Sequence, residues 1–181
     1  MKKMHSFRYN EMMRLRSGDD EASFTSTGAK ILVVEYSPAQ RKMMIQRLKN
    51  ADESWDIYQA ENGEDALSKL KASLWRFDVV VVHEYFSLND GLMGRELVTL
   101  IRRQSKMSMC VIIACISNPA DSWEDLKSVG VDYVWSKPLP ASNEIKLTID
   151  ELLQIRIRAS MVETQSVRAP TGTSAKSNRF E

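Results

Sequence analysis

The sequence predicts an α/β protein in which a five-stranded parallel sheet lies between two layers of helices. Short apolar segments alternate along the chain with segments in which apolar residues recur at helical spacing. The strand segments do not alternate apolar and polar residues, and residues 79–82 are four consecutive valines, which is typical of strands covered on both faces. Right-handed crossovers between five such strands give a doubly wound sheet.

The boundaries of the elements follow the stretches of apolar residues between polar turns. The expected strands cover residues 30–35, 55–60, 77–82, 109–117 and 132–136. The helices that follow them in turn cover residues 38–51, 62–74, 94–105, 120–130 and 144–159.

The first helix has the clearest start. Ser37 is a favourable N-cap residue, and Pro38 takes the first helical position, where a backbone N–H is not needed. Met43, Met44 and Leu48 follow at helical spacing and predict its buried face.

The later helices are predicted from the same kind of pattern. Helix 62–74 has Ala66, Leu67 and Leu70 on one face, and helix 120–130 ends in Gly130. The last helix holds more apolar residues than one buried stripe usually uses, which indicates that part of it meets a partner. These residues are Leu147, Ile149, Leu152, Leu153, Ile155 and Ile157.

The composition changes near both ends of the chain. Residues 1–28 are polar, with charges of both signs, and predict a flexible N-terminal arm. Residues 29–158 form the expected domain, which is close to the commonest domain size. Residues 159–181 are rich in serine and threonine with little to bury, and they predict a disordered tail.

The bulk composition is that of a soluble globular protein. The 181 residues include 25 Lys+Arg and 24 Asp+Glu, so a net charge of +1 gives no bulk electrostatic case for nucleic acid or an acidic membrane. No apolar run approaches the roughly 20 residues of a membrane helix. Cys110 and Cys115 lie in one apolar run and are interpreted as reduced core thiols. The expected location is intracellular, in the cytoplasm or the nucleus.

Polar side chains follow four of the expected strands. Glu35 and Tyr36 end the first strand, His83 the third, Ser117 the fourth and Lys137 the fifth. In a doubly wound sheet, ligand chemistry lies outside the carboxyl ends of the strands. An acid, a histidine, a hydroxyl and a lysine are therefore expected to converge there.

At this point the chain resembles a known family, the response-regulator receiver domain of two-component phosphorelays, over about residues 30–155. The Lys-Pro pair after the fifth strand, with a glycine seven residues before the lysine, is the most specific feature. The Asp90-Gly91 pair after the third strand is the next. The segments that carry the resemblance are ILVVEYSP, FDVVVVHEYFSLNDG, VIIACIS and GVDYVWSKPL.

The resemblance implies a role for each of these positions. His83 stands where receivers have the aspartate that accepts a phosphoryl group. Glu35 keeps one of the two acids that help to hold Mg²⁺, and Tyr36 replaces the other. Because two of the three carboxylates are missing, and Mg²⁺ prefers oxygen ligands, we expect no cofactor and at best weak Mg²⁺ binding through Glu35.

The resemblance also implies two residues that contact phosphoryl oxygens. Lys137 is one, and Ser117 is the other, although an ungapped count back from Lys137 puts Cys115 at the hydroxyl position. With no phosphoryl group to bind, Lys137 is expected to form a structural ion pair with Glu35, because both residues are expected at the carboxyl ends of adjacent inner strands.

Several roles for His83 stay open from the sequence. It can be a solvated or hydrogen-bonded residue without chemistry, a phosphoryl acceptor, or a ligand of a soft metal together with Glu35 and a cysteine. Its neighbour Glu84 can mimic a permanent negative charge, but successive strand residues point to opposite faces, which separates it from His83.

The partner surface of receivers includes the fifth strand, and its switch aromatic aligns here with Val134. Tyr133 and Trp135 flank that position and are the candidate partner-facing residues.

The sequence therefore predicts a receiver-like signalling module without enzymatic activity. It is best described as a pseudo-receiver that contacts another signalling protein, such as a kinase, a phosphotransfer protein or an output domain. The alternatives are an active phosphorelay receiver with an unusual acceptor and a small flavodoxin-like nucleotide- or cofactor-binding protein. Against the latter, no glycine-rich loop follows the first strand, where the sequence is EYSPAQ.

Overall fold

Five parallel strands form one sheet in the order β2-β1-β3-β4-β5, which confirms the predicted fold class. The strands are β1 (Lys30–Val34), β2 (Asp56–Ala60), β3 (Val79–His83), β4 (Val111–Ile116) and β5 (Tyr133–Ser136). The structure is a computed structural model and describes residues 28–74, 76–83, 92, 94–107, 109–117 and 119–167.

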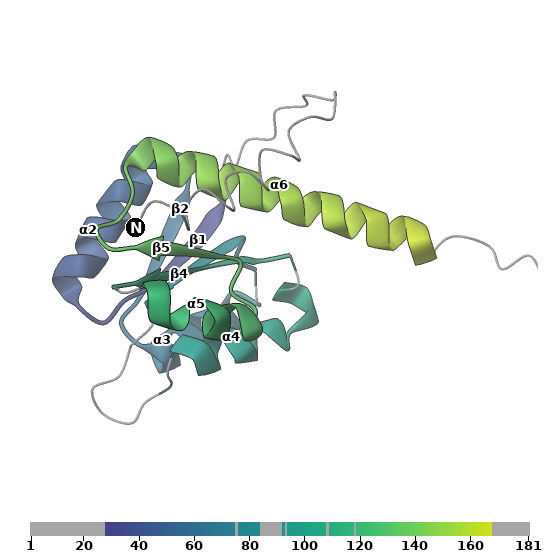
Figure 1. Cartoon of the computed structure of the whole chain (residues 1–181), viewed down its shortest axis with the longest axis horizontal. Helices are drawn as coiled ribbons and strands as arrows, with labels where there is room; N and C mark the ends of the chain where they lie inside the picture. The colour runs from purple at the N-terminus through teal and green to yellow at the C-terminus, as the bar shows by residue number, and fades with distance from the viewer. Residues whose placement is uncertain are drawn as a thin grey trace, which may run out of the picture.

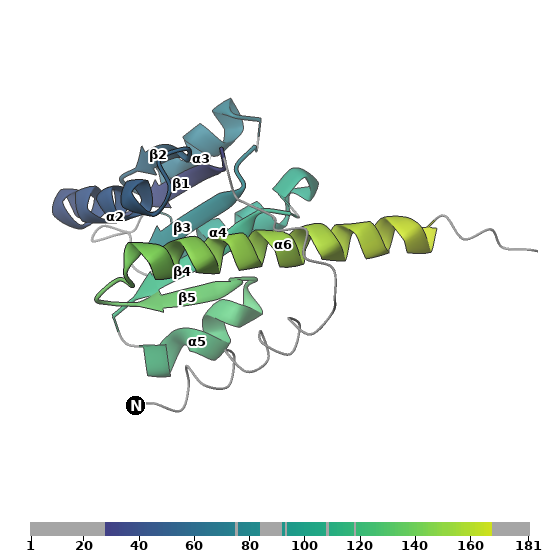
Figure 2. The ribbon, with the colours of Figure 1, turned by 90° about the horizontal axis from the view of Figure 1, so that it is seen from above.

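Helices cover both faces of this sheet. The helices are α2 (Pro38–Ala51), α3 (Gly63–Ala72), α4 (Gly94–Arg102), α5 (Pro119–Ser128) and α6 (Ser142–Val167), with a short 3-10 turn η2 (Ser105–Met107). Figures 1 and 2 show α2 and α6 side by side on one face, with α3, α4 and α5 on the other. The chain therefore has two hydrophobic cores, one under each helix layer.

The start of α2 is as predicted. The side chain of Ser37 accepts a hydrogen bond from the backbone N–H of Gln40, and Pro38 opens the helix. Met44 and Leu48 are buried against the sheet. The expectation for Met43 was wrong, because its side chain is 47% exposed. Neighbouring residues on a helix are about 100° apart, so Met43 lies off the face that Met44 buries.

The α3 and α5 boundaries are set by caps. Asn62 caps α3 by accepting from the N–H of Asp65, while Ala66 is buried beneath the helix. Gly130 follows α5 with a φ of 101°, the left-handed conformation in which helices commonly end on glycine.

Helix α6 is longer than the sequence pattern indicated. Its backbone continues to Val167, so the expected disordered tail from residue 159 was wrong over its first nine residues. Leu147 and Ile155 point away from the sheet, 55% and 40% exposed. The face toward the sheet buries Ile145, Ile149, Leu152 and Leu153.

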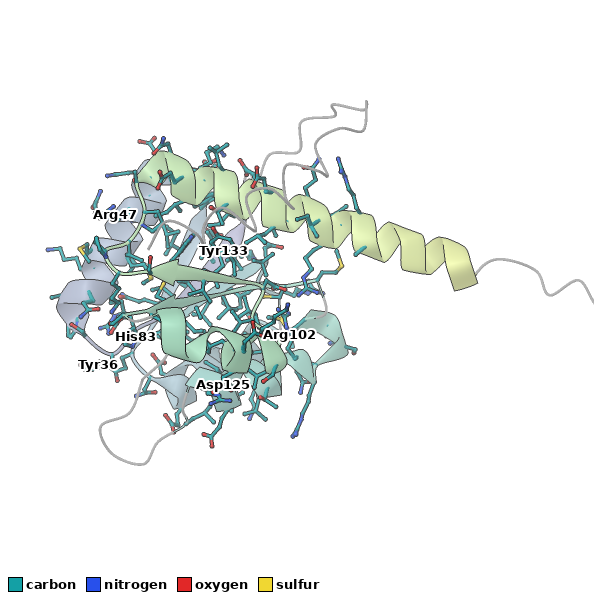
Figure 3. The ribbon with its side chains drawn as sticks, in the orientation of Figure 1. Tyr36, Arg47, His83, Arg102, Asp125 and Tyr133 are labelled. Atoms are coloured by element: carbon teal, nitrogen blue, oxygen red, sulfur yellow. The ribbon has the colours of Figure 1, made fainter. Side chains whose placement is uncertain are left out.

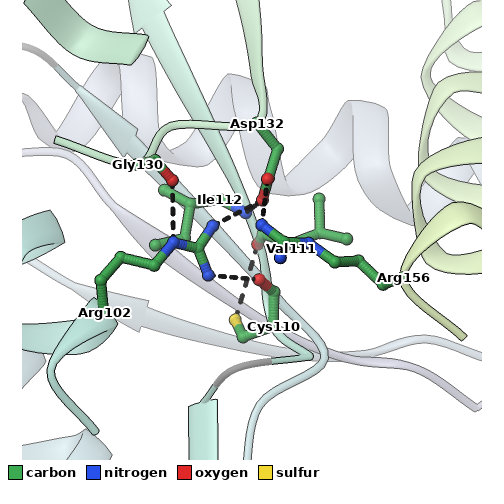
Figure 4. Close-up of polar contacts among 7 residues, drawn as sticks. All are labelled: Arg102, Cys110, Val111, Ile112, Gly130, Asp132 and Arg156. Atoms are coloured by element: carbon green, nitrogen blue, oxygen red, sulfur yellow. Dashed lines mark hydrogen bonds and ion pairs between the residues drawn. The ribbon is translucent and has the colours of Figure 1, made fainter. Parts of the chain in front are cut away.

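A cluster of charged side chains closes the amino-terminal end of β4 and β5 (Figure 4). Both oxygens of the Asp132 carboxylate are used: Oδ2 lies 2.6 Å from Arg102 and accepts from the N–H of Ile112 at 2.8 Å, and Oδ1 accepts from Arg156. Arg102 also donates to the carbonyl oxygen of Gly130 at 2.8 Å. The cluster thereby ties α4, β4, β5 and α6 together.

The expected arm, residues 1–28, lies outside the described residues except for Gly28, whose N–H donates to Ser54 Oγ at 3.0 Å. Across the described residues, none of the helices combines the length and apolarity that crossing a membrane requires.

Candidate functional site at the carboxyl ends of the strands

The carboxyl end of the sheet places several of the predicted site residues in one row. In the strand register His83 pairs with Cys115, and Cys115 pairs with Trp135. Glu35 comes one residue after the last paired position of β1 and is level with His83. Because side chains alternate along a strand, all four lie on the α2/α6 face, and so does Lys137, two residues beyond Trp135.

Glu35 is the buried acid of this site. Its side chain is 0% exposed. Oε1 accepts a hydrogen bond from the N–H of Ser37 at 3.0 Å. Oε2 is 3.6 Å from Nζ of Lys137 and has no hydrogen-bond partner. The carboxylate is thus held by one backbone donor and one cation.

Lys137 follows β5, and its peptide bond to Pro138 is cis. Its Nζ donates to Oε1 of Gln40, in the first turn of α2, in addition to its ion pair with Glu35. The side chain is 23% exposed. The cation therefore already has two oxygen partners within the protein.

The prediction of an ion pair between Lys137 and Glu35 is confirmed, but the expectation about their strands was wrong. The strands β1 and β5 are not adjacent, because β3 and β4 lie between them. Strands are about 4.8 Å apart, so the pair spans three strand spacings, about 14 Å of sheet. Two long side chains reaching toward each other cover that separation.

Gln40 was missed as a site residue. Ser37 and Gln40 have the spacing of a capping box, in which the glutamine side chain would return to the N–H of Ser37. Here that N–H donates to Glu35 instead, and the glutamine side chain is bound to Lys137. The spacing of Ser37 and Gln40 could have drawn attention to the glutamine, but it predicts a helix cap and not a contact with Lys137.

His83 and Tyr36 meet at the edge of the site (Figure 3). Their ring centroids are 6.4 Å apart at an interplanar angle of 57°. His83 is 9% exposed, so it is largely buried, whereas Tyr36 is 43% exposed. His83 is therefore buried rather than solvated, and its imidazole lies in the row between Glu35 and Cys115. A hydrogen-bonded role without chemistry stays a prediction.

Cys115 and Ser117 were the two candidates for the hydroxyl position. Cys115 is fully buried in the core under α2 and α6, and burial raises the pKa of its thiol to about 12. A buried, protonated thiol is a poor metal ligand, which argues against a soft-metal site with His83 and Glu35. Ser117 is exposed at the end of β4 and makes no hydrogen bond to the other site residues among those described.

The described residues at the carboxyl ends of the strands do not fit a Mg²⁺ ion. A hard cation needs several oxygen ligands, and receivers supply them from three carboxylates. Here Glu35 is the one carboxylate among the described residues at these positions, and its oxygens face a backbone N–H and an ammonium group. In the described part of the chain, no group of three or more His, Cys, Asp and Glu side chains could hold a metal ion.

The structure corrects the expected partner face on β5. Trp135 is 3% exposed and packs in the core under α2 and α6, so its side chain is not on the surface. Tyr133 is half-buried against the same core. Val134 points to the opposite face, where it packs on the other core. Odd-numbered residues of this strand face the α2/α6 layer, which is why both aromatic residues turn inward.

The strand order, the two helix layers and the site at the carboxyl ends define the class: the chain has the fold of response-regulator receiver domains. The chemotaxis response regulator CheY4 of Vibrio cholerae is similar, with 26% identity and a TM-score of 0.54 over 73% of this chain and 98% of that one. No family model matches the sequence, and no curated protein matches it significantly.

Two further solved structures show the same fold at lower identity. One is the receiver domain of a sensor histidine kinase from Pseudomonas aeruginosa, with magnesium in its active-site cleft: 20% identity, TM-score 0.60, covering 71% of this chain and 99% of that one. The other is the receiver domain of a putative Luxo repressor protein from Vibrio parahaemolyticus: 20% identity, TM-score 0.61, covering 75% and 97%.

Proposed function

We propose that this protein is a pseudo-receiver: a signalling module with the receiver fold that acts by contact with another signalling protein and takes up no phosphoryl group. The observation that carries the proposal is that Lys137 already has partners inside the protein. Its ammonium group pairs with the buried carboxylate of Glu35 and donates to Gln40. The cation that would contact a phosphoryl group is thereby neutralised inside the protein.

The chemistry at the acceptor position supports the same conclusion. Formation of an acyl phosphate needs a carboxylate nucleophile and a metal ion that neutralises the incoming oxygens. His83 supplies no carboxylate, and the exposed phenol of Tyr36 replaces the second acid. Both requirements are therefore missing, and we propose that the protein uses no Mg²⁺ and catalyses no reaction.

The partner that fits this proposal is a kinase, a phosphotransfer protein or an output domain, met inside the cell. The exposed Leu147 and Ile155 on the outer face of α6 are apolar side chains available for such a contact. Since Trp135 is in the core, this face replaces the one expected from β5.

The test is incubation of the full chain with acetyl phosphate and Mg²⁺, followed by intact-mass measurement. We expect no mass increase of one phosphoryl group in the wild type. An added phosphoryl group that disappears in His83→Ala would refute the pseudo-receiver and establish the active receiver with an unusual acceptor.

A matched gain-of-function variant shows whether the rest of the site is intact. His83→Asp combined with Tyr36→Asp restores three carboxylates at the carboxyl ends, and we expect Mg²⁺-dependent changes in tryptophan fluorescence and acid-stable mass labelling to appear together. The single His83→Asp variant is the control for the added charge. If the double variant shows no Mg²⁺ response, the contacts among Glu35, Lys137 and Gln40 prevent metal binding even when the missing acids are restored.

A further inference from the structure

A second feature lies at the other end of the sheet, where β1, β3 and β4 begin. A cavity of about 630 Å³ opens there, and its floor is formed in part by Phe77 and Cys110, which are 6% and 2% exposed. Three exposed cations, Lys30, Arg76 and Lys106, line its mouth. The cavity is of the size that holds ligands or short peptide segments.

The charge of this cavity is positive. Among the described residues that line it, the one acid is Asp78, whose Oδ2 accepts a hydrogen bond from the backbone N–H of Lys30 at 2.8 Å. Three cations face one carboxylate that already holds a backbone donor. An occupant must therefore bring negative charge for the mouth and an apolar group for the floor.

The chain itself carries such a segment a few residues before Gly28 in the sequence. Asp19, Asp20 and Glu21 are three consecutive acids, and Phe24 follows three residues later. Gly28, a lining residue of the cavity, is only seven residues beyond Glu21. Seven residues span at most about 25 Å when extended, so the acids are within reach of the three cations.

We propose that residues 19–24 dock in this cavity, with the acids at Lys30, Arg76 and Lys106 and the Phe24 ring toward the apolar floor. Tethering makes the contact intramolecular, with an effective concentration in the millimolar range for a short flexible linker. A charge contact that would be weak between separate molecules is therefore formed for much of the time when both parts belong to one chain. The inference is independent of the site at the carboxyl ends.

The full chain offers a clean way to test this docking. Burial raises the pKa of both native thiols, Cys110 and Cys115, to about 12, so a spin label reacts selectively with a cysteine introduced as Ser17→Cys. Paramagnetic broadening is then read from amide resonances at the cavity, such as Phe77, and at the opposite end, such as Ala60. We expect severalfold stronger broadening at the cavity.

Charge variants separate docking from mere proximity of the tether. Asp19→Asn, Asp20→Asn and Glu21→Gln together should reduce the cavity broadening to that of a free tether, and high salt should act likewise. Lys30→Glu, Arg76→Glu and Lys106→Glu together should do the same. The matched control makes the same change of charge on exposed lysines that do not line the cavity, and it should keep the broadening; it combines Lys42→Glu, Lys49→Glu and Lys71→Glu.

Two results would overturn the proposal. The first is equal broadening at the cavity in the wild-type chain and in the variant whose three acids at residues 19–21 are neutralised. The second is release of the arm by micromolar inorganic phosphate, which would assign the cavity to a free anion. Far-UV circular dichroism of each variant verifies that the exposed substitutions leave the fold intact.

Discussion

Replacing Lys137 by methionine should destabilise the protein by about 3 kcal/mol, because it leaves the carboxylate of Glu35 buried without its cation. At the observed 3.6 Å, the attraction is on the order of 4–5 kcal/mol with an effective dielectric constant of about 20. Desolvation of the fully buried carboxylate opposes this attraction, so the intact pair contributes little in net terms. After the substitution the desolvation penalty remains and the attraction is lost.

The reverse substitution, Glu35→Gln, should cost less, about 1 kcal/mol. Lys137 keeps its contact with Gln40, and its partly exposed side chain can regain water. The double variant should lose about 2 kcal/mol, which is less than the sum of the two single losses, because no charge is left unpaired.

Urea unfolding at neutral pH measures all four proteins of this cycle. With a typical dependence of 1–3 kcal/mol per molar urea, roughly 3 kcal/mol shifts the midpoint by about 1 M or more. Lys127→Met, at an exposed lysine in the last turn of α5, is the matched control and should change stability by less than about 0.5 kcal/mol. Losses that add within about 0.5 kcal/mol would refute the coupling. Stabilisation by Lys137→Met would instead indicate a strained lysine kept for binding phosphate.

Three further predictions concern the rest of the domain. Asp132→Ala should cost about 3 kcal/mol in urea unfolding, because it leaves two arginines at the cluster without their shared carboxylate; a loss below 1 kcal/mol would contradict this. Hydrogen bonds from Lys146 and Ser54 lower the pKa of Asp52 to about 2, below its unfolded value of about 3.9, so its carboxylate stabilises the fold above about pH 4. The stability difference between wild type and Asp52→Asn should therefore be about 1 kcal/mol at pH 6, after allowance for solvent screening, and vanish as the pH falls toward 2; a constant difference would exclude the linkage. The fragment 28–167 contains both cores and should melt cooperatively within a few degrees of the full chain by circular dichroism, whereas loss of cooperativity would show that the missing ends are needed for folding.

The sequence predicted the sheet, its strands and most helix starts, because those depend on local patterns. Four valines in a row favour a strand covered on both faces, and a serine followed by proline favours a helix start. The end of α6 was missed because the apolar pattern stops near Ala159, whereas a helix continues until something breaks it. After Ala159 the first proline is Pro170, and each further residue adds a backbone hydrogen bond once the helix exists.

Side-chain partners were predicted less well than positions. Trp135 was placed on the right strand but on the wrong face, although the period of two along β5 could have assigned it to the core with Tyr133. The Arg102–Asp132–Arg156 cluster was not predicted at all. Asp132 is 30 residues from Arg102 and 24 from Arg156 in the sequence, and the three meet through strand order, which no local pattern encodes.

Gln40 contacts Lys137 instead of capping α2, and this choice affects how the site can bind a metal ion. If the glutamine returned to the N–H of Ser37, as a capping box requires, Lys137 would lose one of its two partners. Glu35 prevents that return by taking the N–H itself, and so it holds the lysine twice: directly through Oε2 and indirectly by freeing Gln40. Acids restored at positions 83 and 36 alone would therefore have to compete with Glu35 and Gln40 for the ammonium group of Lys137. Loss of Gln40 in that background, as Gln40→Ala, is expected to weaken the Mg²⁺ response, because Lys137 then turns toward the restored carboxylates and its ammonium group competes with the metal ion for their oxygens.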